Sequence, residues 1–140
     1  MSFHISVVLL EHLEFINQVP DNDDDMDKWT KECEKLNLYE APLDAGGVVY
    51  EYWSKIAHHL HLPLIAAIYN EGLKLYASEI SALEIEMEKL ERYWEENELT
   101  GVETFEWDQV SAKIDLKERL NYLREAAEVA RKNRAVLIVC

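Results

Sequence analysis

The sequence predicts an all-α fold: one helical domain over residues 1–140, a bundle built on a long antiparallel helical hairpin. Two apolar stripes with alternating steps of three and four residues predict it, because this spacing places every member on one side of a helix. The first stripe consists of Leu73, Tyr76, Ile80, Leu83, Met87, Leu90 and Trp94, and the second of Leu116, Leu120, Leu123, Ala127 and Ala130. We expect helices over about 64–97 and 115–133 to pack along these stripes.

The charges of the two segments independently favour this pairing. Residues 79–98 hold eight glutamates against two basic residues, whereas residues 113–134 hold seven basic residues against four acidic ones. Exposed ion pairs contribute only about 0–1 kcal/mol each, so they select the partner and the register. Burial of the stripes, at roughly 1.5–3 kcal/mol for each large apolar side chain, supplies the stability.

The first helix of the hairpin should have two different halves. Up to Ile85 a second apolar line accompanies the stripe, and beyond it the other faces are rich in glutamate. We therefore expect the distal half to be covered on one side only and to project from the body. Asp115 and Glu118 have the spacing of a capping box at the start of the last helix.

Shorter elements precede the hairpin. Residues 3–18 follow helical spacing, so we predict a helix, with a strand over 5–10 as the alternative. A short helix capped by Asp25 should follow, then a connection over 38–43 and a third helix capped by Asp44. Residue Pro63 suits the first turn of the helix after that.

The chain ends in an apolar tail, residues 135–140. Three interpretations are open: an extension of the last helix, a contact in a homodimer, or a short strand paired with residues 5–10. Its β-branched residues Val136, Ile138 and Val139 favour the strand. The fold class therefore includes a short terminal β element as an option.

Composition excludes some partners and favours others. The 28 acidic against 14 basic residues give a net charge of −14, which repels nucleic acid and anionic membranes. No apolar run is long enough to span a bilayer, and no secretory signal is visible. Cys33 and Cys140 match no zinc pattern and are expected to be free thiols. We predict a cytoplasmic protein.

Two patterns resemble metal sites. Asp21, Asp23, Asp25 and Glu32 fall at positions 1, 3, 5 and 12 of a calcium loop, but Met26 occupies the position that needs glycine. His58 and His61 are three residues apart and could reach one metal ion from a helix, although no third ligand lies nearby. We therefore predict neither a metal nor a cofactor.

Motifs for hydrolases, phosphate loops and di-iron carboxylate sites are absent from the sequence. We predict a non-enzymatic acidic protein-binding module, such as an intracellular inhibitor or immunity-type protein for a basic partner. The alternatives are a homodimeric structural protein and a metal-dependent enzyme that uses His58 and His61. The residues predicted to form the binding surface are Asp23, Asp24, Glu88, Glu91, Trp94, Glu95, Glu96 and Trp107.

Overall fold

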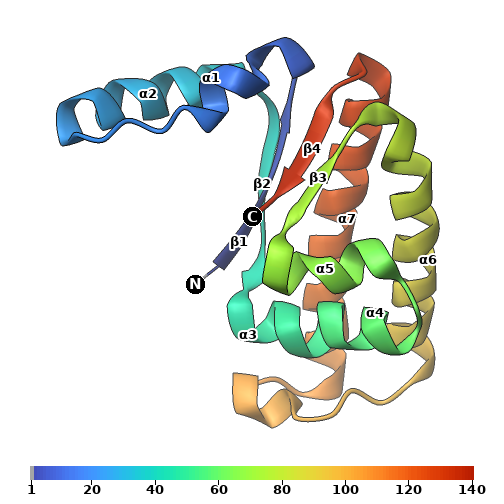
Figure 1. Cartoon of the computed structure of the whole chain (residues 1–140). Coiled ribbons are helices and arrows are strands. Elements are labelled where there is room, and N and C mark those ends of the chain that lie inside the picture. The colour runs from blue at the N-terminus through green and yellow to red at the C-terminus, as the bar shows by residue number, and fades with distance from the viewer. Residues whose placement is uncertain (1) are drawn as a thin grey trace.

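Four strands form one antiparallel sheet in the computed structural model, which describes residues 2–140. The strands are β1 (Ser2–Val8), β2 (Asn37–Ala45), β3 (Leu73–Leu75) and β4 (Val136–Val139), in the order β2-β1-β4-β3. Helices cover one face of this sheet (Figure 1). The prediction of an all-α helical bundle is therefore wrong, and the fold is a mixture of helices and sheet.

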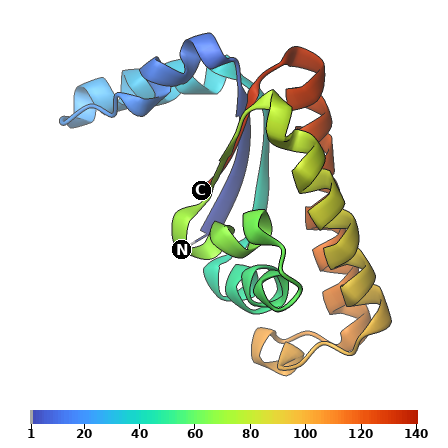
Figure 2. The ribbon, with the colours of Figure 1, turned by 45° about the vertical axis from the view of Figure 1, so that its right-hand side comes forward.

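Helices and helical turns account for most of the remaining chain (Figures 1 and 2). The segments α3, η2 and α4 follow one another without a break, and η2 is π-helical. The elements are η1 (Leu10–His12), α1 (Leu13–Asn17), α2 (Asp23–Leu36), α3 (Gly46–Val48), η2 (Val49–Ser54), α4 (Lys55–His59), α5 (Pro63–Glu71), η3 (Ala77–Glu79), α6 (Ile80–Glu96), η4 (Val102–Phe105) and α7 (Gln109–Asn133).

The predicted helix over 3–18 is wrong, because the segment begins as β1 and continues as the short turns η1 and α1. Phe3, Ile5 and Val7 are buried, whereas Ser2 and His4, which alternate with them, are exposed. This period of two is the pattern of a strand with one covered face. It competes with a helical spacing over the same residues, and the strand pairings decide between them.

The predicted connection over 38–43 is also a strand, β2, at the edge of the sheet. Pro42 is compatible with this place because an edge strand leaves one row of backbone groups without partners. The tail forms β4, which confirms the strand interpretation of residues 135–140. It pairs with β1 on one side, from Ile5↔Val139 to Val8↔Val136, and with β3 on the other.

The predicted continuous helix over 64–97 is wrong, because β3 and η3 separate α5 from α6. The break begins at Gly72, whose φ of 71° is one that residues with a side chain rarely adopt. A Cβ at this position would lie 2.6 Å from the carbonyl oxygen of Val139. Close approach of β4 therefore requires glycine here, and Leu73 and Tyr76 of the apolar stripe are not helical.

The rest of the predicted hairpin is present in α6 and α7. The stripe residues from Ile80 to Trp94 and from Leu116 to Ala130 are buried. Arg124 donates two hydrogen bonds to Glu91, at 2.8 and 3.0 Å, and Arg131 forms an ion pair with Glu84. The position later in α6, Glu91, faces the position earlier in α7, Arg124, so the two helices are antiparallel.

Two details of the hairpin differ from expectation. Helix α7 begins at Gln109, and the side chain of Asp108 caps it by accepting a hydrogen bond from the Ser111 amide, so Asp115 is not the cap. The distal half of α6 does not project. Its Trp94 packs edge-on against Trp53, with ring centroids 5.1 Å apart, and donates to the Tyr52 carbonyl. Helical segments of the middle of the chain thus cover this half.

Glu86 is a buried carboxylate that joins two helices. It lies on α6, and its two oxygens accept hydrogen bonds from the amides of Leu64 and Ile65 at 3.2 and 2.9 Å. These amides belong to the first turn of α5, where the predicted Pro63 occupies the first position. A carboxylate at a helix N-terminus is also favoured by the helix dipole.

We expect Glu86→Ala to lower the free energy of unfolding by about 1–3 kcal/mol, because one buried and one partly buried amide lose their acceptor. Glu86→Gln retains one acceptor and should lose less. Urea unfolding followed by circular dichroism measures both. Glu88→Ala, which removes an exposed carboxylate on the same helix, is the matched control. An unchanged midpoint for Glu86→Ala would contradict the capping role.

Removing β4 should abolish cooperative unfolding. Its buried side chains, Val136, Leu137 and Val139, contribute roughly 1.5–3 kcal/mol each, which together matches the whole net stability of a typical domain. A chain stopped after Arg134 also leaves β3 without a partner strand and β1 with only one, β2. Thermal melts by circular dichroism test this, with Cys140→Ser as the control. A sharp transition in the shortened chain would show that the sheet forms without β4.

Candidate functional site

Residues 9–36 form an arm that leaves the sheet between β1 and β2 and points away from α6 and α7 (Figures 1 and 2). Leu13 is the one buried residue of this arm, all of which the structure describes. It packs with Val8 and Val136 on the face of the sheet opposite the main helices. The arm is therefore attached at its base and solvated along the rest of its length.

The far end of the arm is acidic. Asn22 caps α2 by accepting a hydrogen bond from the amide of Asp25 at 2.9 Å, so the predicted cap Asp25 lies inside the first turn with Asp23 and Asp24. Carboxylates are favoured in this turn by the helix dipole. The indole nitrogen of Trp29 donates to the Phe15 carbonyl at 3.0 Å and ties α2 to α1.

The two metal-like patterns do not converge. Helix α2 begins at Asp23, so residues that would form the calcium loop are helical. His58 belongs to α4, whereas His61 lies in the following turn with a φ of 60°. Among the described residues, no group of three or more potential ligands is close enough to hold a metal ion.

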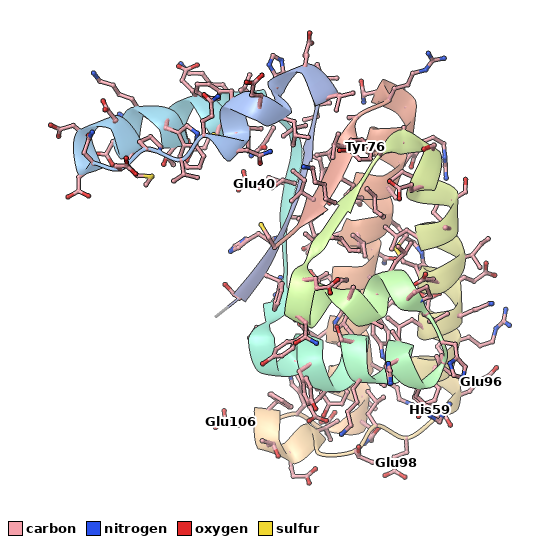
Figure 3. All side chains as sticks on the ribbon, viewed as in Figure 1. Glu40, His59, Tyr76, Glu96, Glu98 and Glu106 are labelled. Atoms are coloured by element: carbon pink, nitrogen blue, oxygen red, sulfur yellow. The ribbon has the colours of Figure 1, made fainter. Side chains whose placement is uncertain are left out.

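The residues predicted for a binding surface lie in separate places. Asp23 and Asp24 are on the arm, whereas the glutamates are on α6. Trp94 is buried in the core, and Trp107 is half-buried against Tyr52. The exposed Glu96 lies at the end of α6 (Figure 3). The structure therefore brings these residues together as two groups, one on the arm and one on the hairpin.

Most of the glutamates on α6 have a basic partner within the protein. Glu88 is 3.8 Å from Arg92 and Glu95 is 3.9 Å from Lys117. The hydrogen bonds from Arg124 lower the pKa of Glu91. Because these carboxylates are paired within the protein, the α6 group carries less unpaired negative charge than the tip of the arm.

A third site was not predicted. A cavity of about 360 Å³ lies where β1 begins and β2 ends, beside α7. Apolar side chains from several elements line part of it, including Phe3, Val48 and Trp107. Its polar lining includes Ser2 and His4 of β1 and three charged side chains: Asp44 of β2, and Asp115 and Arg119, which are one turn apart on α7.

Asp44 is the most perturbed group in this cavity. Its side chain is only 6% exposed, and Oδ2 accepts a hydrogen bond from Trp53 Nε1 at 3.1 Å. Oδ1 lies 3.9 Å from Arg119 Nε, beyond hydrogen-bond distance, and that buried nitrogen has no hydrogen-bond partner among the described residues. Burial, and then the charge of Asp115, raise the pKa of Asp44 to about 7, against the opposing effects of Trp53 and Arg119.

Asp44 was predicted to cap a helix, and this role is wrong. The helical segment begins at Gly46 with Ala45 as its N-cap, and no side chain caps it. Asp44 and Arg119 are far apart in the sequence, so no local spacing indicates their contact. The one sequence signal for this site is the charged residue Asp44 directly after the apolar residue Leu43.

Comparisons with known proteins give no family for this chain. No family model matches it, and no curated protein or solved structure is significantly similar. None of the helices in the described part of the chain is long and apolar enough to cross a membrane.

The pKa of Asp44 predicts a pH-dependent stability. The native protein retains this proton up to about pH 7, whereas an unfolded aspartate releases it near its usual 3.8. The free energy of unfolding should therefore fall between about pH 4 and pH 7 by an amount on the order of 2–4 kcal/mol.

The change should disappear in Asp44→Asn, which retains an oxygen for Trp53 and carries no charge. Urea unfolding of both proteins at several pH values isolates the contribution of this group, because all other titrating residues are shared. A constant difference between the two proteins across this pH range would rule out the raised pKa.

Proposed function

We propose that this protein is a non-enzymatic acidic protein-binding module whose arm docks on a basic protein. The observation that supports this most directly is a 14-residue helix, α2, with no buried residue along its described length. Ordering a solvated helix costs conformational entropy, and this helix gains no stabilisation from burial in the core. A partner that covers the arm would supply this stabilisation.

The charge of the arm supports a basic partner. It carries nine acidic residues against three lysines, and residues 21–27 include five aspartates and no basic residue. A concentrated negative potential attracts a positively charged surface and raises the association rate, an effect that salt screens.

The arm also exposes apolar side chains that a partner would cover. Leu10 and Val19 are each 56% exposed, and Phe15 is 40% exposed. Protein interfaces typically combine such apolar anchors with a charged rim. Acidic tip and apolar flank together suit a protein partner better than a small ion.

Two further parts of the proposal follow from chemistry. The thiols of Cys33, which is half-buried, and Cys140, which is exposed, are free, as suits a reducing compartment, so we propose a cytoplasmic location. A small acidic module without evident catalytic motifs is consistent with an inhibitor or immunity-type role, in which binding alone blocks a basic protein.

The test uses the arm itself as the variable. Wild type and Asp23→Asn/Asp24→Asn serve as baits in a lysate of the cells that express the protein, at low and high salt. We expect a basic protein that the wild type retains and the variant loses. Its purified form should bind the wild type at least about tenfold more tightly than the variant, with affinity falling as salt increases.

Glu95→Gln/Glu96→Gln, which removes two charges from the hairpin, is the control and should bind like the wild type. The indole N–H resonance of Trp29, which reports on the arm, should shift in the complex. Affinity that is independent of salt, or equal for wild type and arm variant, would refute docking through the acidic arm.

A further inference from the structure

We infer that the cavity lined by Asp44, Asp115 and Trp107 binds an organic cation, a primary ammonium or guanidinium group on a short aliphatic stem. This site lies apart from the arm. The arm begins where β1 ends, whereas the cavity lies where β1 begins, and a seven-residue strand extends about 20 Å. The inference therefore stands independently of the proposed function.

Charge is the first argument. Besides the imidazole of His4, the cavity holds two carboxylates and one guanidinium, so above about pH 7, where Asp44 is ionised, the carboxylates exceed the guanidinium by one negative charge. Burial is the main cause of the raised pKa of Asp44, and the negative charge of Asp115 raises it further. A positive guest would offset this repulsion, and the burial of Asp44 strengthens the interaction because it lowers the local dielectric constant.

Geometry is the second argument. Asp44 is held in place by Trp53, and its Oδ1 has no hydrogen bond to the nearby Arg119. The orientation of this carboxylate is thus fixed before a ligand arrives. Ammonium and guanidinium groups carry several N–H donors and no acceptor, which matches a site with free carboxylate oxygens.

The lining is the third argument. A volume of about 360 Å³ lies in the range of small-molecule pockets. Phe3, Val48 and Trp107 offer apolar surface for an aliphatic stem, and an indole ring also attracts a cation to its face. A bare divalent metal ion fits poorly, because Ca²⁺ requires six to eight oxygen ligands and Mg²⁺ six.

The same chemical group can come from two sources, a free small molecule or a lysine or arginine side chain of another protein. Both present an alkyl stem that ends in a cation. Two probes distinguish them. The alkyl stem of n-butylguanidinium ends in a methyl group, as in a free small molecule. The stem of N-acetyl-arginine methylamide is attached to a peptide backbone, as in a protein side chain.

The experiment follows the indole N–H resonance of Trp53 in ¹H–¹⁵N spectra at about pH 8, where Asp44 is ionised. Trp53 is a local reporter because it donates to Asp44. We expect n-butylguanidinium to shift this resonance to saturation and to leave Trp29, on the arm, unchanged. The neutral isostere n-butylurea should cause no shift. If N-acetyl-arginine methylamide also binds, the ligand is a protein side chain. If it does not bind, the ligand is a free small molecule.

Asp44→Asn and Asp115→Asn should each weaken binding of n-butylguanidinium by about tenfold or more, because each removes a charge-assisted contact. Asp23→Asn/Asp24→Asn should bind like the wild type, so failure of the arm proposal and of this inference are distinguishable. Circular dichroism confirms that each variant is folded. The inference is overturned if wild type shows no saturable shift up to about 50 mM, if n-butylurea binds equally, or if both cavity variants bind like the wild type.

Discussion

The insertion of β4 between β1 and β3 is the contact on which the rest of the structure depends. Strand β4 supplies hydrogen bonds to both neighbours, and its Leu137 and Val139 are fully buried. It follows directly on α7, so the same segment places that helix across the sheet. Strand β1 crosses this sheet, with the cavity at its first residues and the arm after its last.

Gly72, which follows α5, and Glu86, which belongs to α6, hold the two ends of α5. Gly72 allows the backbone of β3 to approach Val139, and Glu86 satisfies the amides at the start of α5. Without the first, β3 could not pair at this distance. Without the second, the helix that leads into β3 would begin with buried amides lacking an acceptor. The two residues therefore fix both ends of one short helix against the core.

Sequence patterns predicted the elements whose evidence is local. The apolar stripes and the charge of α6 and of α7 are each patterns within a single helix. The place of Pro63 in the first turn of α5 was predicted from equally local evidence. Each of these depends on residues no more than a few turns apart, where periodicity carries the information.

Most of the sheet escaped prediction because its evidence is not local. The pairing of Ile5 with Val139, nearly the full chain away, belongs to one of the three interpretations of the tail, and local patterns could not choose among them. Leu73 and Tyr76 continued the apolar stripe by coincidence of spacing, and Gly72 was the one sign of a break. The contact of Asp44 with Arg119 depends on the same long-range pairing. The cavity could therefore not be found before the sheet was known.

The acidic residues behind the net charge of −14 are paired with basic residues to different extents in different parts of the molecule. This difference matters for both proposals. Along α6, glutamates such as Glu84 and Glu91 face arginines of α7, so their charge is largely cancelled within the protein. On the arm, Asp23 and Asp24 face solvent. In the cavity, two carboxylates, Asp44 and Asp115, share one guanidinium, that of Arg119. Recognition of a cation is therefore best sought where acidic groups remain uncompensated, rather than where they are most numerous.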